Sequence, residues 1–297
     1  MAEYLLYNYK PSLPAAAIFI VFFALATLAH IYLAAKHKTK FLTAFIIGGL
    51  MEAIGYATRA VNAQQAPDYS TMPYALQSLF ILLAPSLFAA SIYMILGRII
   101  RLTHGDSRSI IRPSRLTKIF VLGDVVSFLI QSGGKPILFQ FHLRIEKSDN
   151  IFIAGGGIMS NAKSGSSLKL GERVIIVGLI VQIIFFGVFC VVAVVFQQRI
   201  TSNPTEQSIK SPPLWYRYLL VLYFASLLIM IRCIYRVVEY IQGQTGTLQK
   251  HEYFAYVLDA LLMLSIMILF AVFHPRHVIP DDLESEESQP MYGRLGG

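Results

Sequence analysis

Charged residues are scarce in this sequence. Asp, Glu, Lys and Arg make up 14% of its 297 residues, whereas hydrophobic residues make up 55%. A soluble domain carries about 25% charged residues, so the composition excludes an ordinary soluble fold and predicts a membrane protein. In such a protein the formal net charge of +8 indicates basic cytoplasmic loops, and we expect no nucleic-acid partner.

Cysteine is also scarce, and no catalytic motif is complete. Cys190 and Cys233 both lie inside apolar runs, which excludes a disulfide framework and a cysteine-based metal site. The stretch GGKPIL at 133–138 lacks the spacing of a phosphate-binding Walker loop. The stretch HPRH at 274–277 is more simply a signal that stops a helix than a metal site. We therefore expect no enzyme activity, no metal and no cofactor.

Long apolar runs are what the sequence has in abundance. A transmembrane helix needs about 20 mostly apolar residues, and the first such run lacks the basic start and the cleavage site of a signal peptide. Pro85 lies inside the third run, where neighbouring groups must satisfy the carbonyl that it leaves free. The predicted fold is an all-α membrane protein with seven transmembrane helices. These spans are residues 15–35, 41–60, 74–100, 116–133, 174–196, 215–238 and 253–273.

Lysine and arginine are distributed unevenly among the connections between these spans. The first connection carries KHKTK at 36–40 and the third carries basic residues from Arg98 to Lys118, whereas the second, at 61–73, has none. Because basic residues collect on the cytoplasmic side, the N-terminus is predicted outside and the C-terminus inside. The expected parts are an extracellular N-terminus (1–14), a membrane domain (15–277) and an acidic cytoplasmic tail (278–297), which we expect to be disordered.

Ionisable side chains recur at helical spacing inside several spans. Such groups are costly in a bilayer and usually face the bundle interior or a cavity. Glu52, Tyr56 and Arg59 share one helix face, and so do Asp124 and Gln131. The side chains predicted to line an intramembrane pathway are Glu52, Arg59, Asp124, Gln131, Gln182, Arg232, Arg236, Glu239, Glu252, Tyr256 and Asp259.

The depth of these groups, at about 1.5 Å per helical residue, predicts a polar funnel that opens to the outer leaflet and closes near Asp124. Its five acids exceed its three bases, so an excess acid can hold a proton or pair with a cationic headgroup. Plainer alternatives remain for some members. Gln182 is expected to make only an interhelical hydrogen bond, and mere ion pairing or snorkelling is the alternative for Arg232, Arg236, Glu239 and Glu252.

Several motifs, in this order, resemble one family. They include EAIGYATR at 52–59, FVLGDVVSFLIQ at 120–131, GLIVQIIFF at 178–186 and IRCIYRVVEYIQGQTGTLQKHEYFAYVLDALLML at 231–264. Over nearly all of residues 15–277 the sequence resembles the fungal lipid-translocating exporter family, the RTA-like proteins. The family pattern carries over at the pathway positions, apart from Tyr256, which helical spacing alone adds.

This resemblance implies a protein with seven spans and an outside N-terminus. It implies export or flipping of sphingoid long-chain bases, resistance to toxic amphiphiles or, in one branch, porphyrin movement, at the plasma membrane or another endomembrane. The leading hypothesis is therefore a translocator whose partners are membrane lipids or amphiphilic small molecules. The alternative is a seven-span receptor or sensor whose basic third connection docks a cytoplasmic protein, and a membrane enzyme is a remote third option.

One stretch does not fit the resemblance. Residues 134–154, GKPILFQFHLRIEKSDNIFIA, separate a short fourth span from the family-like GGGIMSN. Deleting them joins the two parts, and the Gly-Lys and Ala-Gly dipeptides at the borders can be encoded by splice-site sequences. We hypothesise that this non-family insertion is a translated, unspliced intron. The competing hypothesis is a genuine amphipathic loop on the outer surface of the membrane.

Overall fold

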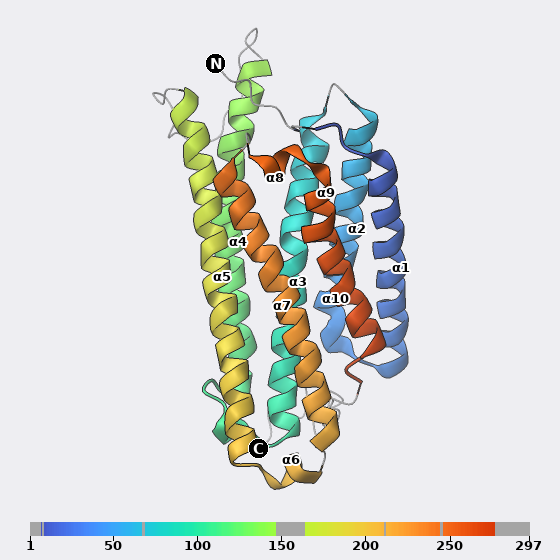
Figure 1. The fold of residues 1–297 in the computed structure, drawn as a ribbon, viewed down its shortest axis with the longest axis vertical. Coiled ribbons are helices and arrows are strands. Elements are labelled where there is room, and N and C mark those ends of the chain that lie inside the picture. The colour runs from blue at the N-terminus through green and yellow to red at the C-terminus, as the bar shows by residue number, and fades with distance from the viewer. Residues whose placement is uncertain are drawn as a thin grey trace, which may run out of the picture.

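The computed structural model describes residue 7 and residues 9–66, 69–146, 164–210, 212–243 and 246–276. Within these residues all regular structure is helical, and the long helices lie side by side in an elongated bundle (Figure 1). The predicted all-α class is therefore confirmed. Six helices of the described chain are long and apolar enough to cross a membrane: Leu13–His37, Lys40–Gln64, Met72–Leu102, Gly171–Ser202, Trp215–Gln242 and Glu252–Val272.

The bundle has two ends, which we name by the short helices that lie there. The α8 end holds α8 and the start of α1, and the α6 end holds α6 and the end of α10 (Figure 1). A π-helical turn, Tyr256–Ala260, joins α9 to α10. The helices are α1 (Leu13–His37), α2 (Thr43–Gln64), α3 (Thr71–Leu102), α4 (Pro113–Glu146), α5 (Ser164–Ser202), α6 (Glu206–Lys210), α7 (Pro212–Gln242), α8 (Thr247–Lys250), α9 (Glu252–Ala255) and α10 (Leu261–Val272).

Local sequence signals explain where α1 begins and ends. Ser12 is its N-cap, and the Ser12 hydroxyl accepts a hydrogen bond from the Ala15 N–H at 3.4 Å. Pro14 occupies the first turn, where a missing N–H leaves no helical bond unmade. At the other end Lys38 adopts a left-handed conformation with φ of 54°, which satisfies carbonyls of the last turn.

Small residues bring neighbouring helices close together. At Gly178 in α5, an added Cβ would lie 2.9 Å from the Ser127 carbonyl oxygen and 3.0 Å from the Gln131 nitrogen, both in α4. At Gly48 in α2, it would lie 2.7 Å from the Phe88 ring of α3. Membrane helices use glycine in this way to allow close backbone approach, so α4 with α5 and α2 with α3 form tight pairs.

Apolar side chains cover the outside of the bundle as well as its core. On α5, for example, Val177, Ile184 and Val191 are 52%, 57% and 59% exposed. Soluble proteins rarely expose such extended apolar surface. The exposed faces are therefore suited to contact lipid acyl chains.

The fourth predicted span is wrong in its end point. It was expected to stop at Gly133 and to give way to a loop, but α4 continues to Glu146 beside α5 (Figure 1). A glycine in a helix costs only about 1 kcal/mol relative to alanine, which lateral packing against a neighbouring helix can outweigh. Residues 147–154 of the proposed insertion lie outside the described residues, and its origin as an intron stays a prediction. α4 is not among the six membrane-crossing helices above.

Candidate functional site

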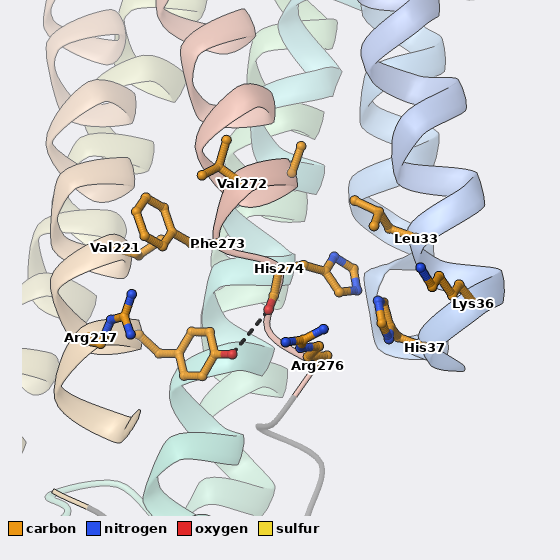
Figure 2. Close-up of a pocket in the computed structure, with 11 residues that line it drawn as sticks. Leu33, Lys36, His37, Arg217, Val221, Val272, Phe273, His274 and Arg276 are labelled. Carbon is orange, nitrogen blue, oxygen red and sulfur yellow. Dashed lines mark hydrogen bonds between the residues drawn. The ribbon is translucent and has the colours of Figure 1, made fainter. Parts of the chain in front are cut away.

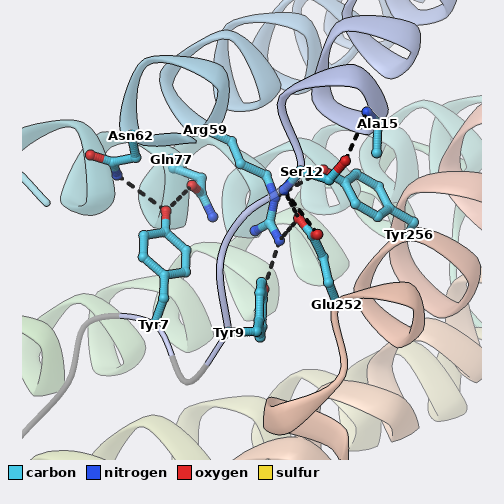
Figure 3. Close-up of polar contacts among 9 residues, drawn as sticks. All are labelled: Tyr7, Tyr9, Ser12, Ala15, Arg59, Asn62, Gln77, Glu252 and Tyr256. Atoms are coloured by element: carbon cyan, nitrogen blue, oxygen red, sulfur yellow. Dashed lines mark hydrogen bonds and ion pairs between the residues drawn. The ribbon is translucent and has the colours of Figure 1, made fainter. Parts of the chain in front are cut away.

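Polar side chains in the bundle interior form separate groups. The first lies at the α8 end, where Arg59 donates to Glu252 at 2.9 Å and to the Tyr9 hydroxyl at 2.6 Å. Arg59 also donates to the Tyr256 hydroxyl at 3.1 Å, and Glu252 accepts from the Ser12 N–H at 2.9 Å (Figure 3). We call these five residues the N-terminal cluster. It ties the segment before α1 to α2 and to the last helical segment.

Tyr7 extends this attachment across the α8 end. Its hydroxyl donates to the Gln77 carbonyl at 2.6 Å and lies 3.1 Å from the Asn62 side-chain amide (Figure 3). Burial raises the pKa of the Tyr7 hydroxyl to about 12, against the opposing charge of Arg59. Tyr7 is therefore a neutral hydrogen-bonding group that helps to close this end of the bundle.

A second group is built around Asp259 in the π-helical turn. Arg232, which is 0% exposed, donates to one Asp259 oxygen at 2.5 Å. Arg236 contacts the other Asp259 oxygen and donates to Glu239 at 2.9 Å. We call these four residues the double-arginine cluster. One carboxylate thus accepts from two guanidinium groups, an arrangement that suits their planar donors.

Arg232 also repairs the backbone of α3. Pro85 has no N–H and therefore leaves the carbonyl of the residue four positions earlier, Ile81, without its helical partner. The Arg232 guanidinium donates to that Ile81 oxygen at 2.7 Å. The neighbouring group that the sequence required for an intramembrane proline is therefore the same side chain that neutralises Asp259.

The π-helical turn contributes one residue to the N-terminal cluster and one to the double-arginine cluster. Turns of this kind occur mostly as single insertions in helices, frequently at functional sites. Here the turn contains Tyr256 and Asp259, which are 8% and 1% exposed. Both side chains thereby face the interior, Tyr256 towards Arg59 and Asp259 towards Arg232.

Three neutral polar residues form a further group between α3, α4 and α5. Gln131 donates to the Gln182 carbonyl at 3.1 Å, and Gln182 donates to the Ser86 hydroxyl at 3.3 Å. Gln182 thus makes the interhelical hydrogen bond expected of it.

Two buried carboxyl groups have no ion-pair partner among the described residues. Glu52 is 1% exposed and Asp124 is 4% exposed, and their oxygens make no hydrogen bond within the described residues. Glu52 lies within electrostatic range of the double-arginine cluster. Asp124 faces the Tyr93 hydroxyl, which lies close enough to act as a hydrogen-bond donor to it but does so with poor geometry, and Asp124 also lies near Cys233. An unpaired buried carboxylate is costly, so each group favours a proton or an incoming cation.

These pairings account for the predicted acidic excess. Arg59 is matched by Glu252, while the double-arginine cluster contains two bases and two acids. The four residues for which ion pairing was the plainer alternative do form ion pairs. Of the five acids set against three bases, Glu52 and Asp124 are therefore the two that remain.

Sequence reasoning missed several members of these groups. Tyr7, Tyr9 and Ser12 precede the first predicted span and were not considered as interior residues. The tyrosine-rich start, YLLYNYKPS, was the available signal. His30 was missed as well, although it is 1% exposed within α1 and its Nε2 lies 2.8 Å from the Met267 carbonyl oxygen. Among the described residues, no three His, Cys, Asp or Glu side chains gather in a way that could hold a metal ion.

The apolar helices, the apolar outer surface and the buried ion pairs define a multi-pass integral membrane protein. The pattern of the family described as RTA1 like protein matches residues 45–282. The chain belongs to this family, as its motifs had indicated.

Characterised relatives cover most of the chain. It is 34% identical to Protoporphyrin uptake protein 1 of Saccharomyces cerevisiae, over 91% of each protein. It is 32% identical to Protein RTA1 of the same yeast, over 91% of this chain and 84% of that protein. It is 24% identical to the Sphingoid long-chain base transporter RSB1, over 86% of this chain and 69% of the transporter. No solved structure matches the chain.

Proposed function

We propose that this protein is a translocator that moves an amphiphile with a cationic head, such as a sphingoid long-chain base, across the membrane. The observation that carries the proposal is the pair of unpartnered interior carboxyl groups, Glu52 and Asp124. Relatives named as a sphingoid long-chain base transporter and as a protoporphyrin uptake protein support transport as the general activity.

The two carboxyl groups suit an ammonium headgroup for a physical reason. A carboxylate that leaves water without a partner loses several kcal/mol of hydration, and an arriving cation or a proton restores part of it. The other interior charges are already matched by the chain, so they offer less to a ligand. The long tail of the amphiphile can stay in the bilayer while its head visits the interior.

We further propose that α4 is a seventh span and that the α8 end faces outwards. The basic residues of the first and third connections support this orientation, which puts the acidic tail in the cytoplasm. The pathway then opens to the outer leaflet, and the N-terminal cluster must loosen to admit a ligand from that side. The proposed location is the plasma membrane, where such export gives resistance to toxic amphiphiles. The proposed partners are lipids or amphiphilic small molecules, with no enzyme activity.

Reconstitution tests this function. Purified protein in liposomes should speed the transbilayer movement of a labelled sphingoid base, and Glu52→Gln and Asp124→Asn should each slow it at least about tenfold, which corresponds to about 1.4 kcal/mol. Asp106→Asn is the matched control, because Asp106 is an exposed acid outside the long helices. It should transport at the normal rate.

Two outcomes would contradict the translocator. Unchanged transport in both interior variants would remove the role of the unpaired carboxyl groups. Absence of transport by the normal protein in liposomes, combined with lost tolerance in cells that lack it, would favour the receptor or sensor. A labelled anionic amphiphile serves as a further comparison, since faster movement of that probe than of the sphingoid base would contradict the cationic headgroup.

A further inference from the structure

A cavity of 450 Å³ lies at the α6 end, where α1, α7 and α10 approach one another (Figure 2). Its lining, taken over the described residues, contains no Asp or Glu. Five of the lining side chains are lysine, arginine or histidine: Lys36, His37, Arg217, His274 and Arg276. This concentration of basic groups is the opposite of the acidic excess in the bundle interior.

The ends of three helices bring these side chains together. Lys36 and His37 are in the last turn of α1, and Arg217 is in the first part of α7. His274 and Arg276 follow the end of α10. Because these positions lie far apart in the sequence, the basic cluster depends on the packing of the bundle.

His274 is held in a fixed position against the cavity. Its carbonyl oxygen accepts from the Tyr218 hydroxyl at 3.2 Å (Figure 2). Its Nε2 lies 3.1 Å from the Thr39 hydroxyl. The His37 and His274 rings are 5.4 Å apart between centroids. His274 is 7% exposed, yet its Nδ1 has no hydrogen-bond partner among the described residues. A buried polar atom without a partner is unusual and leaves a place for a ligand atom.

The electrostatics of the cavity favour an anion. Burial, together with the nearby His37, His30 and Arg276, lowers the pKa of His274 to about 4. Arg217 is exposed and makes no ion pair within the described chain. A negative ligand would offset the positive charges of Lys36 and Arg217, and guanidinium groups bind phosphate oxygens with good geometry.

One wall of the cavity is apolar and faces outwards. Val272 is 69% exposed and Phe273 is 39% exposed, and both line the cavity. They continue the apolar surface of α10, on which Ile268 is 53% exposed. A ligand with a phosphate among the basic groups could therefore lay its apolar chains along this surface.

We propose that this cavity is a binding site for a phosphate-bearing anion, with the headgroup of an acidic phospholipid as its occupant. Basic pockets between transmembrane helices are known to bind such headgroups. The site is separate from the interior carboxyl groups and selects the opposite charge. It does not depend on the transport proposal, because its ligand acts as a bound lipid and need not cross the membrane.

Ligand binding can be measured on the purified full-length protein in an uncharged detergent. Trp215 is the only tryptophan in the chain and stands two positions before Arg217, so its fluorescence reports on this region. Dioctanoyl phosphatidic acid should raise the Tm and change the Trp215 emission in a saturable manner. Dioctanoyl phosphatidylcholine should do neither. Inorganic phosphate, tested alone, shows whether the free anion suffices or whether the acyl chains contribute.

The decisive variant combines Lys36→Ala with Arg217→Ala. Both side chains are exposed, so the fold should survive, and phosphatidic acid should bind at least about tenfold more weakly. The matched control combines Lys118→Ala with Arg199→Ala, which removes two exposed basic residues that do not line the cavity. It should bind phosphatidic acid normally.

Each of these binding measurements supports or contradicts the proposed site. A response to phosphatidic acid that is lost only in the Lys36 and Arg217 variant supports it, and an equal response to inorganic phosphate assigns the site to the free anion. No response to either phosphate probe would overturn the proposal. An equal loss in both double variants, or an equal response to phosphatidylcholine, would also overturn it. None of these results depends on transport activity.

Discussion

The bundle interior and the cavity at the α6 end treat charge in opposite ways. In the interior, guanidinium groups are matched by carboxylates from other positions in the chain, as in the pair of Arg232 with Asp259. In the cavity, several basic groups meet with no acidic side chain in the lining of the described residues. Paired charges stabilise the fold, because removing one member of a pair leaves the other buried without a counterion. A ligand gains most where a charged or ionisable group has no counterion among the described residues, as at Arg217 in the cavity and at Glu52 and Asp124 in the interior.

The largest effect should come from breaking a matched pair. Arg232→Met removes the fully buried guanidinium, so that one Asp259 oxygen and the Ile81 carbonyl lose their donor while Arg236 still contacts the other Asp259 oxygen. Loss of one partner of a buried ion pair costs about 3–5 kcal/mol. We expect a large fall in the Tm measured in detergent, together with poor expression. A variant as stable as the normal protein would show that this pair is not structural.

The backbone role of Arg232 can be separated from its charge. Arg232→Lys keeps a cation for Asp259 but lacks the fork that also reaches Ile81. In a Pro85→Ala background the restored N–H can bind the Ile81 carbonyl, so Arg232→Lys should be less harmful there by about 1 kcal/mol. Thermal unfolding of the four proteins in this double-mutant cycle measures the difference. The same loss in both backgrounds would contradict the repair of α3 by Arg232.

Matched and unmatched acids should respond differently to the same substitution. Glu252→Gln weakens the bond with Arg59 and should lower stability by about 1–3 kcal/mol. Glu52→Gln removes an unpaired carboxyl and should not lower the Tm, although we expect it to impair transport. Such a trade-off is common where a destabilising group serves function. Equal losses of stability in the two variants would contradict the difference between paired and unpaired acids.

A further effect concerns His274 and the dependence of stability on pH. The unfolded chain binds a proton at this residue below about pH 6.5, whereas the folded protein binds it only near pH 4. Folding stability should therefore fall as the pH decreases through this window and level off below it. After allowance for partial solvent screening, His274 should account for about 1–2 kcal/mol of this fall. His274→Asn should flatten the dependence of Tm on pH, and His251→Asn, at an exposed position, should not.

The interior polar groups were largely predictable from sequence because charged residues in apolar runs are few. Helical spacing placed Glu52 and Arg59 on one face, and the balance of acids and bases predicted two unmatched acids. The family resemblance supplied the same positions independently. Their pairing was not predictable, because it depends on how the separate helices pack, which brings Asp259 against Arg232 and Arg236 of α7.

Other features escaped sequence reasoning for physical reasons. The end of α4 was misplaced because glycine was treated as a break, whereas the helix continues through Gly133 and Gly134 to Glu146. The HPRH motif was interpreted only as a stop signal. α10 does end just before it, at Val272, but His274 and Arg276 also line the cavity. That cavity lies between three helix ends that are far apart in the sequence, so no local sequence pattern predicts it.

The position of the carboxylates in the chain has a consequence for biosynthesis. Glu252 and Asp259, which bind Arg59 and Arg232 in the finished protein, both belong to the last helical segment. Since α2 and α7 precede both carboxylates in the chain, both helices can enter the membrane before either carboxylate does. Insertion of the last helical segment therefore completes the fold, since Arg59 and Arg232 gain their carboxylate partners only then. The same step lets Glu252 bind Ser12 and fix the N-terminal segment at the α8 end. A nascent chain that stops before Glu252 carries buried cations and is a natural substrate for quality control.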